Sequence, residues 1–340
     1  MNTKWTLIAA LGLMVGCKTD DEPSKTEYLD SATPGGDEGG DEGGNEGTGG
    51  DDCEAVVGDF EPESGTTGFY YRDTFQVTFD EDARDLGATA TLVDSAGTDV
   101  GVSMSFDDTG FKAELIPSSP LEANTDYTLT VNVCTDSASA AFTTSEYGAT
   151  LGIDPTALAG ATYNFSLGEA DYTQPEGLGP VLASFLTEPL LIGVSEATGS
   201  ELRILGTQGS GSGSDVVPDP AYDIWDFGNA SLDGAYFQSA PTNIELGYDC
   251  ASIPIYDFTL QGTFAADGSS IGGGSAIGLG DSRDMGCLIG AGSDPAALCN
   301  YAAAVGFTCE NCPDGNPYCL TIEAWFEPAV LVSDVSLTLE

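Results

Sequence analysis

Histidine is absent from the 340 residues, and only eight residues are lysine or arginine against 55 aspartates and glutamates. Without histidine, the chain has no Ser-His-Asp triad, Cys-His nucleophile pair, HExxH zinc site or histidine general base. So few basic residues exclude nucleic acid as a partner, because nucleic-acid binding depends on neutralising phosphates. These absences point away from the commonest catalytic classes, and no recognisable catalytic motif replaces them.

The rest of the composition is that of a folded and strongly acidic protein. Hydrophobic residues make up 41% of the chain, with 15 phenylalanines and 13 tyrosines, which is enough to fill hydrophobic cores. The length predicts about two domains. Residues 53–340 hold 43 of the acids and five of the bases, so the acidity belongs to the folded domains rather than to a tail.

The N-terminus carries an export signal. Lys4 precedes an apolar run over residues 5–15, which is too short to span a bilayer and typical of a secretory signal. Gly16 followed by Cys17 resembles the lipobox of bacterial lipoproteins. The resemblance implies cleavage of residues 1–16 and acylation of Cys17, giving a lipid anchor in a membrane. Lys18 after the cysteine favours the outer membrane, with the protein facing the periplasm or the cell surface. The alternative is an ordinary signal peptide with a chance cysteine.

Residues 17–52 follow as the anchor and a linker. The stretch GGDEGGDEGGNEGTGG repeats a unit of two glycines and two polar residues. Glycine maximises chain entropy and the carboxylates repel one another. We therefore expect an extended, flexible, acidic tether.

Residues 53–147 have the pattern of a small β domain. Apolar and polar residues alternate in FQVTF at 75–79 and in YTLTVNV at 127–133, as they do in strands with one buried face. Further strands are expected at 88–94, 100–106 and 111–117. A spacing of about ten residues between strands favours a β-sandwich.

This part of the chain resembles the bacterial Ig-like domains of surface-layer and adhesin proteins. The resemblance rests on FDE at 79–81, IP at 116–117, PLEANTDY at 120–127 and AFTT at 141–144. It implies an Ig-like β-sandwich that acts as a spacer or interaction module, and it carries over no catalytic residues.

Residues 148–340 are expected to form a larger cysteine-rich β domain with two short helices, at 180–186 and 294–305. The clearest strand patterns lie at 163–167, 190–194, 202–205, 256–264, 320–326 and 335–339. The fold class is therefore all-β, and periodicity leaves open whether this second domain is a sandwich or a barrel. Residues 260–284 and 309–320 resemble uncharacterised lipoproteins of myxobacteria, which implies an exported, cysteine-stapled envelope protein without a known activity.

Nine cysteines are present, and setting Cys17 aside as the lipid acceptor leaves eight, an even number that suits disulfides in an exported protein. Cys53 and Cys134 bracket the Ig-like domain and are expected to pair. Fifteen connectivities remain for the other six, which are Cys250, Cys287, Cys299, Cys309, Cys312 and Cys319. The alternatives are a zinc site or a redox pair around the CxxC at 309–312. Export, the even count and the lack of histidine argue against zinc, and the lack of a βαβ pattern argues against redox chemistry.

Carboxylates are the only plentiful reactive groups. Hard oxygen ligands in turns suit Ca²⁺, and the candidate ligands are Asp80, Asp82, Asp281 and Asp284. The alternative is a solvated acidic surface, since no EF-hand motif is present. So acidic a fold must relieve its self-repulsion, and the hypothesis is that Ca²⁺ or high salt stabilises it. Thermal melting that millimolar Ca²⁺ and molar NaCl both leave unchanged would exclude it.

Three functions from different classes fit these observations. The first is a cell-envelope surface lipoprotein with a non-catalytic binding, adhesion or structural role and a carbohydrate or protein ligand. The second is a carboxylate-dependent hydrolase or a carbohydrate-binding module in the C-terminal domain, with Asp223, Trp225 and Asp226 as candidate sugar contacts. A third is a lipid carrier, if the second domain is a hollow barrel.

Overall fold

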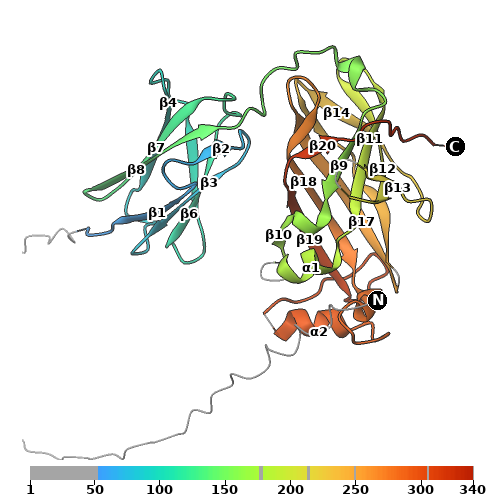
Figure 1. The fold of residues 1–340 in the computed structure, drawn as a ribbon. Helices are drawn as coiled ribbons and strands as arrows, with labels where there is room; N and C mark the ends of the chain where they lie inside the picture. Colours follow the sequence, from blue (N-terminus) through green and yellow to red (C-terminus); the bar gives the residue numbers. More distant parts are fainter. Residues whose placement is uncertain (1–52, 176–178, 213–214, 249, 305, 340) are drawn as a thin grey trace, which may run out of the picture. The chain divides into compact units, whose positions relative to one another are not determined.

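The computed structural model describes residues 53–175, 179–212, 215–248, 250–304 and 306–339. These residues form two β-rich domains, an eight-stranded sandwich and a larger barrel (Figure 1). The all-β fold class is thereby confirmed. The signal peptide at 1–16, the lipid acceptor Cys17 and the tether at 17–52 lie outside the described residues. Within the described part of the chain, no helix is long and apolar enough to cross a membrane.

The Ig-like domain packs two four-stranded sheets face to face. One sheet has the order β1-β3-β6-β5 and the other the order β2-β8-β7-β4, with β2 and β8 parallel and the other pairs antiparallel. The strands are β1 (Val57–Glu61), β2 (Thr67–Phe69), β3 (Phe75–Phe79), β4 (Thr89–Asp94), β5 (Val102–Phe106), β6 (Lys112–Pro117), β7 (Asp126–Val133) and β8 (Asp136–Thr144).

The alternation in the sequence determines which side chains fill the sandwich. In β3, Phe75, Val77 and Phe79 are buried while the residues between them are only half-buried. In β7 every second residue from Tyr127 to Val133 is buried. Phe142 of β8 adds an aromatic contact, with its ring centroid 5.2 Å from that of Phe75. Burying such rings contributes about 25 cal/mol per Å² of apolar surface. The strand predictions for this domain are confirmed.

The second domain is a barrel that eight strands close, in the order β9-β11-β12-β14-β15-β17-β18-β20 and back to β9. These strands are β9 (Thr162–Ser166), β11 (Pro189–Ala197), β12 (Glu201–Ser210), β14 (Trp225–Asp233), β15 (Tyr236–Gln238), β17 (Ala251–Phe264), β18 (Ser270–Asp281) and β20 (Ala329–Leu331). The choice that periodicity left open between sandwich and barrel is thus settled as a barrel.

Two long strands, β17 and β18, each have two shorter neighbours along one side. Strand β17 pairs with β15 through residues 261–263 and with β16 (Thr242–Tyr248) through residues 251–258. Strand β18 pairs in the same way with β20 and with β19 (Cys319–Phe326), which also pairs with β10 (Asp171–Gln174). A further short strand, β13 (Val217–Pro218), pairs with the end of β12.

Both expected helices are present, and Figure 1 shows them near the same end of the barrel. Helix α1 (Gly179–Phe185) places Leu182 in the barrel core, and α2 (Ala297–Ala304) places Leu298 there. The Asp294 carboxylate accepts a hydrogen bond from the amide of Ala296 at 3.0 Å, as expected for a side chain that caps a helix start.

The expected strand at 335–339 is wrong, because this segment has no strand pairing. Asp334 has a φ of +60°, in a turn just before the segment. Leu337 is instead buried in a small cluster with Leu191 and Leu205. Its side chain lies against Gly193 of β11, where an added Cβ would be 3.0 Å from it. The apolar alternation here reflects packing on the outside of the barrel and not a strand.

All eight cysteines outside the signal region form disulfides. Cys53 pairs with Cys134 as expected, with Cα atoms 5.4 Å apart. The barrel domain has the pairs Cys250–Cys287, Cys299–Cys309 and Cys312–Cys319. The two cysteines of the CxxC motif therefore have different partners. A zinc site would need free thiolates and a redox pair would need these two cysteines to bond to each other, so neither interpretation fits the structure.

Side chains of the segment between β2 and β3 contact the barrel strands. The Tyr70 hydroxyl lies 2.7 Å from that of Thr263 on β17. The Arg72 guanidinium lies 3.9 Å from the ring centroid of Tyr236 and 3.7 Å from the carboxylate of Asp233. A cation held over an aromatic ring and beside a carboxylate adds a modest attraction to each contact.

Candidate functional site

A groove of about 640 Å³ lies on the outside of the barrel where β14 and β16 separate. The C-terminal end of β14 is joined to β17 through the short strand β15. At the N-terminal end of β14 no such strand intervenes among the described residues, and a space is left between β14 and β16. The lining residues come from three places, the segment 221–225, strand β16 and the outward side of β17. They are Ala221, Tyr222, Asp223, Trp225, Asn243, Ile244, Glu245, Gly247, Tyr248, Ala251, Ser252, Pro254 and Tyr256.

A buried glutamine bridges the base of this groove. The side-chain amide of Gln208, on β12, donates a 2.9 Å hydrogen bond to the Gly247 carbonyl, and its oxygen accepts a 2.6 Å bond from the Gly247 amide. Gln208 thereby pairs with the backbone of β16 as a neighbouring strand would. Tyr222 lies directly over Gly247, where an added Cβ would be 2.1 Å from its ring. Glycine at 247 is therefore required for this approach.

The polar side chains of the groove alternate along its strands. Asn243 and Glu245 point outward from β16 and are exposed, because successive residues of a strand face opposite sides. The hydroxyl of Ser252, on β17, donates a hydrogen bond to the Glu245 carboxylate. Tyr256 lies four residues after Ser252 on β17, so its side chain faces the same side of the strand, and it is half-buried. The groove thus combines tyrosine rings with carboxylate, amide and hydroxyl groups.

Of the three residues proposed from the sequence as sugar contacts, Asp223 and Trp225 line the groove and Asp226 does not. Asp226 forms an ion pair with Arg203 at 2.7 Å, and the Arg203 hydrogen bond lowers the pKa of the Asp226 carboxyl. Trp225 is only 9% exposed and belongs largely to the barrel core. The sequence motif missed Tyr222, Glu245 and Tyr256, which lie in the same groove. The sequence signal that could have indicated Glu245 and Tyr256 is their place among the outward-facing positions of β16 and β17.

The calcium candidates of the Ig-like domain are engaged by protein groups. Asp82 accepts hydrogen bonds from the Arg84 side chain, one of them at 2.9 Å, and these bonds lower the pKa of the Asp82 carboxyl. Asp80 accepts a 2.6 Å bond from the amide of Val56. A cation would have to displace Arg84, so calcium binding here stays a prediction.

The other two candidates are not brought together at a shared site. Asp281 is 3% exposed and accepts hydrogen bonds from Arg283 Nε at 2.9 and 3.0 Å. Asp284 is exposed in the 3₁₀-helix Arg283–Cys287. Among the described residues, the one group of three potential metal ligands is Asp281 with Cys312 and Cys319. Those two cysteines form a disulfide, which removes them as thiolate ligands.

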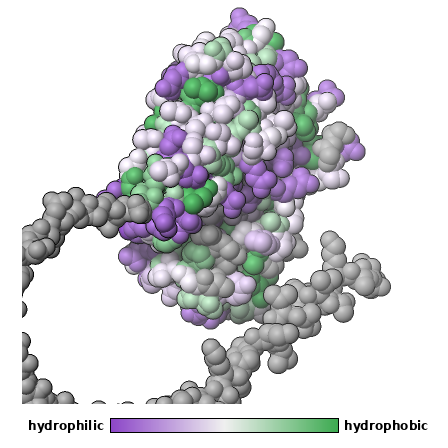
Figure 2. Space-filling model, turned by 90° about the vertical axis from the view of Figure 1, so that its left-hand side faces the viewer, coloured by the Kyte–Doolittle hydropathy of each residue, from purple (hydrophilic) through white to green (hydrophobic). Residues whose placement is uncertain are grey.

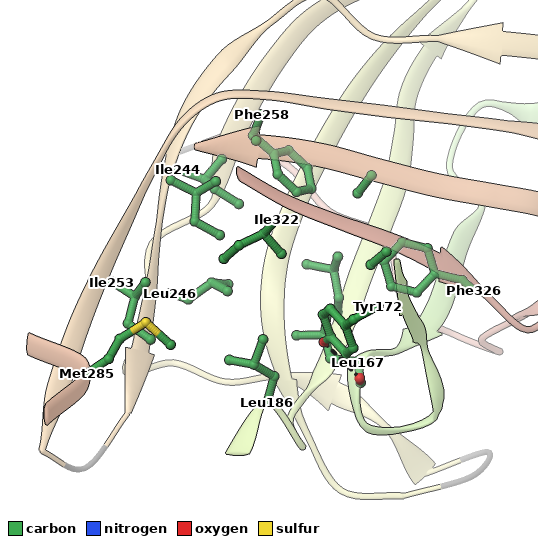
Figure 3. A pocket seen from close by; sticks show the side chains of 15 residues that line it. Leu167, Tyr172, Leu186, Ile244, Leu246, Ile253, Phe258, Met285, Ile322 and Phe326 are labelled. Atoms are coloured by element: carbon green, nitrogen blue, oxygen red, sulfur yellow. Dashed lines mark hydrogen bonds between the residues drawn. The ribbon is translucent and has the colours of Figure 1, made fainter. Parts of the chain in front are cut away.

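A small cavity inside the barrel is lined almost wholly by apolar side chains. Side chains from opposite walls, including those of Leu246, Met285 and Leu186, point into it (Figure 3). Tyr172 turns its hydroxyl away to donate a 2.9 Å hydrogen bond to the Leu167 carbonyl. The cavity volume is about 30 Å³, room for about one or two water molecules. The barrel is therefore closed but filled, and an acyl chain does not fit this conformation.

The acidity appears on the molecular surface as expected. Figure 2 shows hydrophilic residues together with residues of intermediate hydropathy over the face drawn, with hydrophobic residues scattered among them. Four of the five basic residues in this part of the chain, the arginines at 72, 84, 203 and 283, form ion pairs with carboxylates. These pairs neutralise few of the acids, so the outer surface carries a large negative charge.

One half-buried carboxyl gives a testable pH dependence. Burial raises the pKa of Asp73, between β2 and β3, to about 7 from an ordinary value of 3.8. Between about pH 4 and pH 7 the folded protein keeps this proton while the unfolded chain loses it, so the carboxyl lowers stability as pH rises through this window. Asp73→Asn is expected to raise the melting temperature relative to wild type at about pH 8 and to leave it unchanged at about pH 3.5.

Differential scanning calorimetry of both proteins across this pH range checks the expectation. Asp85→Asn, at an exposed carboxyl, is the control and should give a small difference at every pH. A melting difference for Asp73→Asn that is the same at both ends of the range would contradict the effect of burial.

Comparison with known proteins finds a family model that matches part of the chain and solved structures that are similar to it. Among solved structures, the chain is similar to the N-terminal part of the bacterial S-layer protein SbsC, with 11% identity, a TM-score of 0.25, and coverage of 51% of this chain and 43% of that one. A longer SbsC structure, residues 31–844, gives 10% identity and a TM-score of 0.23 over 84% of this chain and 54% of that one. The chain thus spans about half the length of these structures. No curated protein matches the sequence. Residues 51–166 match the family model of the bacterial Ig-like domain.

Proposed function

We propose that the chain is a cell-surface lipoprotein with a non-catalytic binding, adhesion or structural role. Cys17 would carry the lipid anchor, and the acidic segment up to residue 52 would hold the two β domains away from the membrane. The observation that carries the proposal is the match of residues 51–166 to the bacterial Ig-like domain, a type of module that suits spacing and interaction at a surface. Four disulfides in the described residues support an oxidising, extracytoplasmic location.

The geometry of the barrel argues against one of the two rival functions, the lipid carrier. A hydrolase of sugars needs two opposed carboxylates in a cleft; Asp223 and Glu245 both line the groove, so the test below separates this alternative from binding. A lipid carrier needs a hollow interior, and the interior cavity holds about 30 Å³. The open groove on the outside of the barrel is a concave surface large enough for a ligand.

The proposal is tested by adding the purified full chain to isolated envelopes of the cells that produce it. The expected result is saturable binding without release of reducing sugar ends from envelope polysaccharides. A deletion strain should show weakened surface attachment or envelope organisation that the full gene restores. Catalytic release of sugar, abolished by an Asp223→Asn substitution, would show that the hydrolase alternative is correct.

A further inference from the structure

We propose that the groove between β14 and β16 binds a neutral oligosaccharide. This assignment rests on the proposed function and names the ligand class for it. Three observations carry it: the form of the groove, the chemistry of its lining and its charge.

The form of the groove suits a small ligand or a short stretch of a longer chain. Its volume of about 640 Å³ lies within the range of about 300–1,000 Å³ that ligand sites occupy. It is open to solvent. Gln208 fixes the base by bonding both backbone groups of Gly247, so the groove exists before any ligand arrives. Preformed sites lose less entropy on binding.

The lining has the two kinds of surface that a sugar ring presents to a protein. Half-buried rings of Tyr222, Tyr248 and Tyr256 offer apolar faces, which suit the C–H face of a pyranose. Asn243 and Glu245 offer amide and carboxylate groups, which pair with the hydroxyls at the ring edge. An apolar ligand would shield these polar groups from water without pairing their remaining hydrogen-bonding capacity, and that costs free energy.

The charge of the groove disfavours an acidic sugar. Asp223 and Glu245 line it, and no arginine or lysine does. Arg203, on the neighbouring strand β12, is held by Asp226 and Glu196. Phosphorylated or uronic-acid glycans would therefore meet repulsion without a compensating cation.

The edge of β16 disfavours an extended peptide as the ligand. A peptide that adds to a sheet needs free backbone groups along the edge strand. At Gly247 the amide and carbonyl are already bonded to Gln208, and the ring of Tyr222 lies over the same residue. The groove also contains an unsatisfied polar group. The buried hydroxyl of Tyr248 has no hydrogen-bond partner among the described residues, and a sugar hydroxyl or a water molecule bound with the sugar would supply one.

The test is an array of neutral, acidic and amino-sugar oligosaccharides probed with the purified full chain, followed by titration calorimetry with the neutral glycan that gives the strongest signal. We expect binding to neutral glycans and an affinity at least tenfold lower in the Tyr222→Ala/Tyr256→Ala variant. Asp223→Asn/Glu245→Gln, which keeps the shape, should lower affinity severalfold. The control Tyr301→Ala removes a tyrosine that is 44% exposed on α2 and outside the groove, and should bind as wild type.

The melting temperature of each variant shows whether it is folded. Binding confined to acidic or amino sugars, equal affinity in the groove variants and Tyr301→Ala, or no glycan binding at millimolar concentration would each overturn the assignment. Envelope binding separates the two proposals. If the full chain binds envelopes equally well with and without the two tyrosines, the groove assignment fails and the surface role stands. If the chain does not associate with envelopes at all, the surface role fails.

Discussion

Replacing Arg283 by methionine is expected to lower the free energy of unfolding by about 2–3 kcal/mol, because it leaves the Asp281 carboxylate buried without its counter-charge. Asp281 is 3% exposed at the end of β18, beside the Cys312–Cys319 disulfide. Arg283, itself about a third exposed, bonds Asp281 and also reaches Asp314 at 2.6 Å. The figure is at the low end for buried pairs because water still reaches the arginine. Urea unfolding followed by tryptophan emission measures the change.

Two controls separate the buried charge from the loss of a side chain. Asp314→Asn removes the exposed partner of the same arginine, and a small change is expected there. The double variant Arg283→Met/Asp281→Leu removes both charges and should recover much of the lost stability. If the double variant is as unstable as Arg283→Met, the destabilisation comes from lost packing and the charge argument is wrong.

Removing the Cys53–Cys134 disulfide is expected to destabilise the Ig-like domain by about 4 kcal/mol, the second large effect. The bond joins residues 81 positions apart, and cross-links that close long loops restrict the unfolded chain most. Cys53→Ser/Cys134→Ser should therefore melt this domain at a much lower temperature. The comparison is Cys299→Ser/Cys309→Ser, where the separation is only ten residues and a smaller loss in the other domain is expected.

Tryptophan provides a readout that tells the domains apart. Among the described residues, tryptophan occurs only at Trp225 and Trp325, both in the barrel domain. After loss of Cys53–Cys134, the tryptophan transition should stay near its wild-type midpoint while far-ultraviolet circular dichroism shows an earlier one. A tryptophan midpoint that falls by the same amount would contradict the separate stability of the barrel.

The fold was largely predictable where one face of a strand is buried. The alternation of apolar and polar residues predicted β3 and β7 of the Ig-like domain, because only one face of each strand, the face that carries Phe75 or Leu129, packs into the core. The same signal misled at 335–339, where Leu337 is buried by packing on the outer face of β11 without backbone pairing. Barrel closure was not predictable, because it depends on β20 joining β9 and β18, three strands that are far apart in the chain.

The candidate site was predictable only in part. The segment at 222–226 concentrates aromatic and acidic residues, and it contributes Tyr222 and Asp223 to the groove. Asp226 is exposed on β14 and held by Arg203 of the neighbouring strand β12, a contact between strands that depends on tertiary structure. Glu245 and Tyr256 belong to other strands, and nothing local in the sequence brings them to the same groove. The disulfide partners depended likewise on tertiary structure, since spacing left fifteen connectivities among six cysteines.

The most direct test of a surface role is protease accessibility on intact cells that produce the full chain. Proteinase K is added to whole cells, and antibodies against the Ig-like domain and the barrel follow the loss of each. We expect both domains to be cleaved while a periplasmic marker in the same cells stays intact, and we expect Cys17→Ser to release the protein from the membrane fraction. Protection of both domains until the outer membrane is broken would contradict a place on the cell surface.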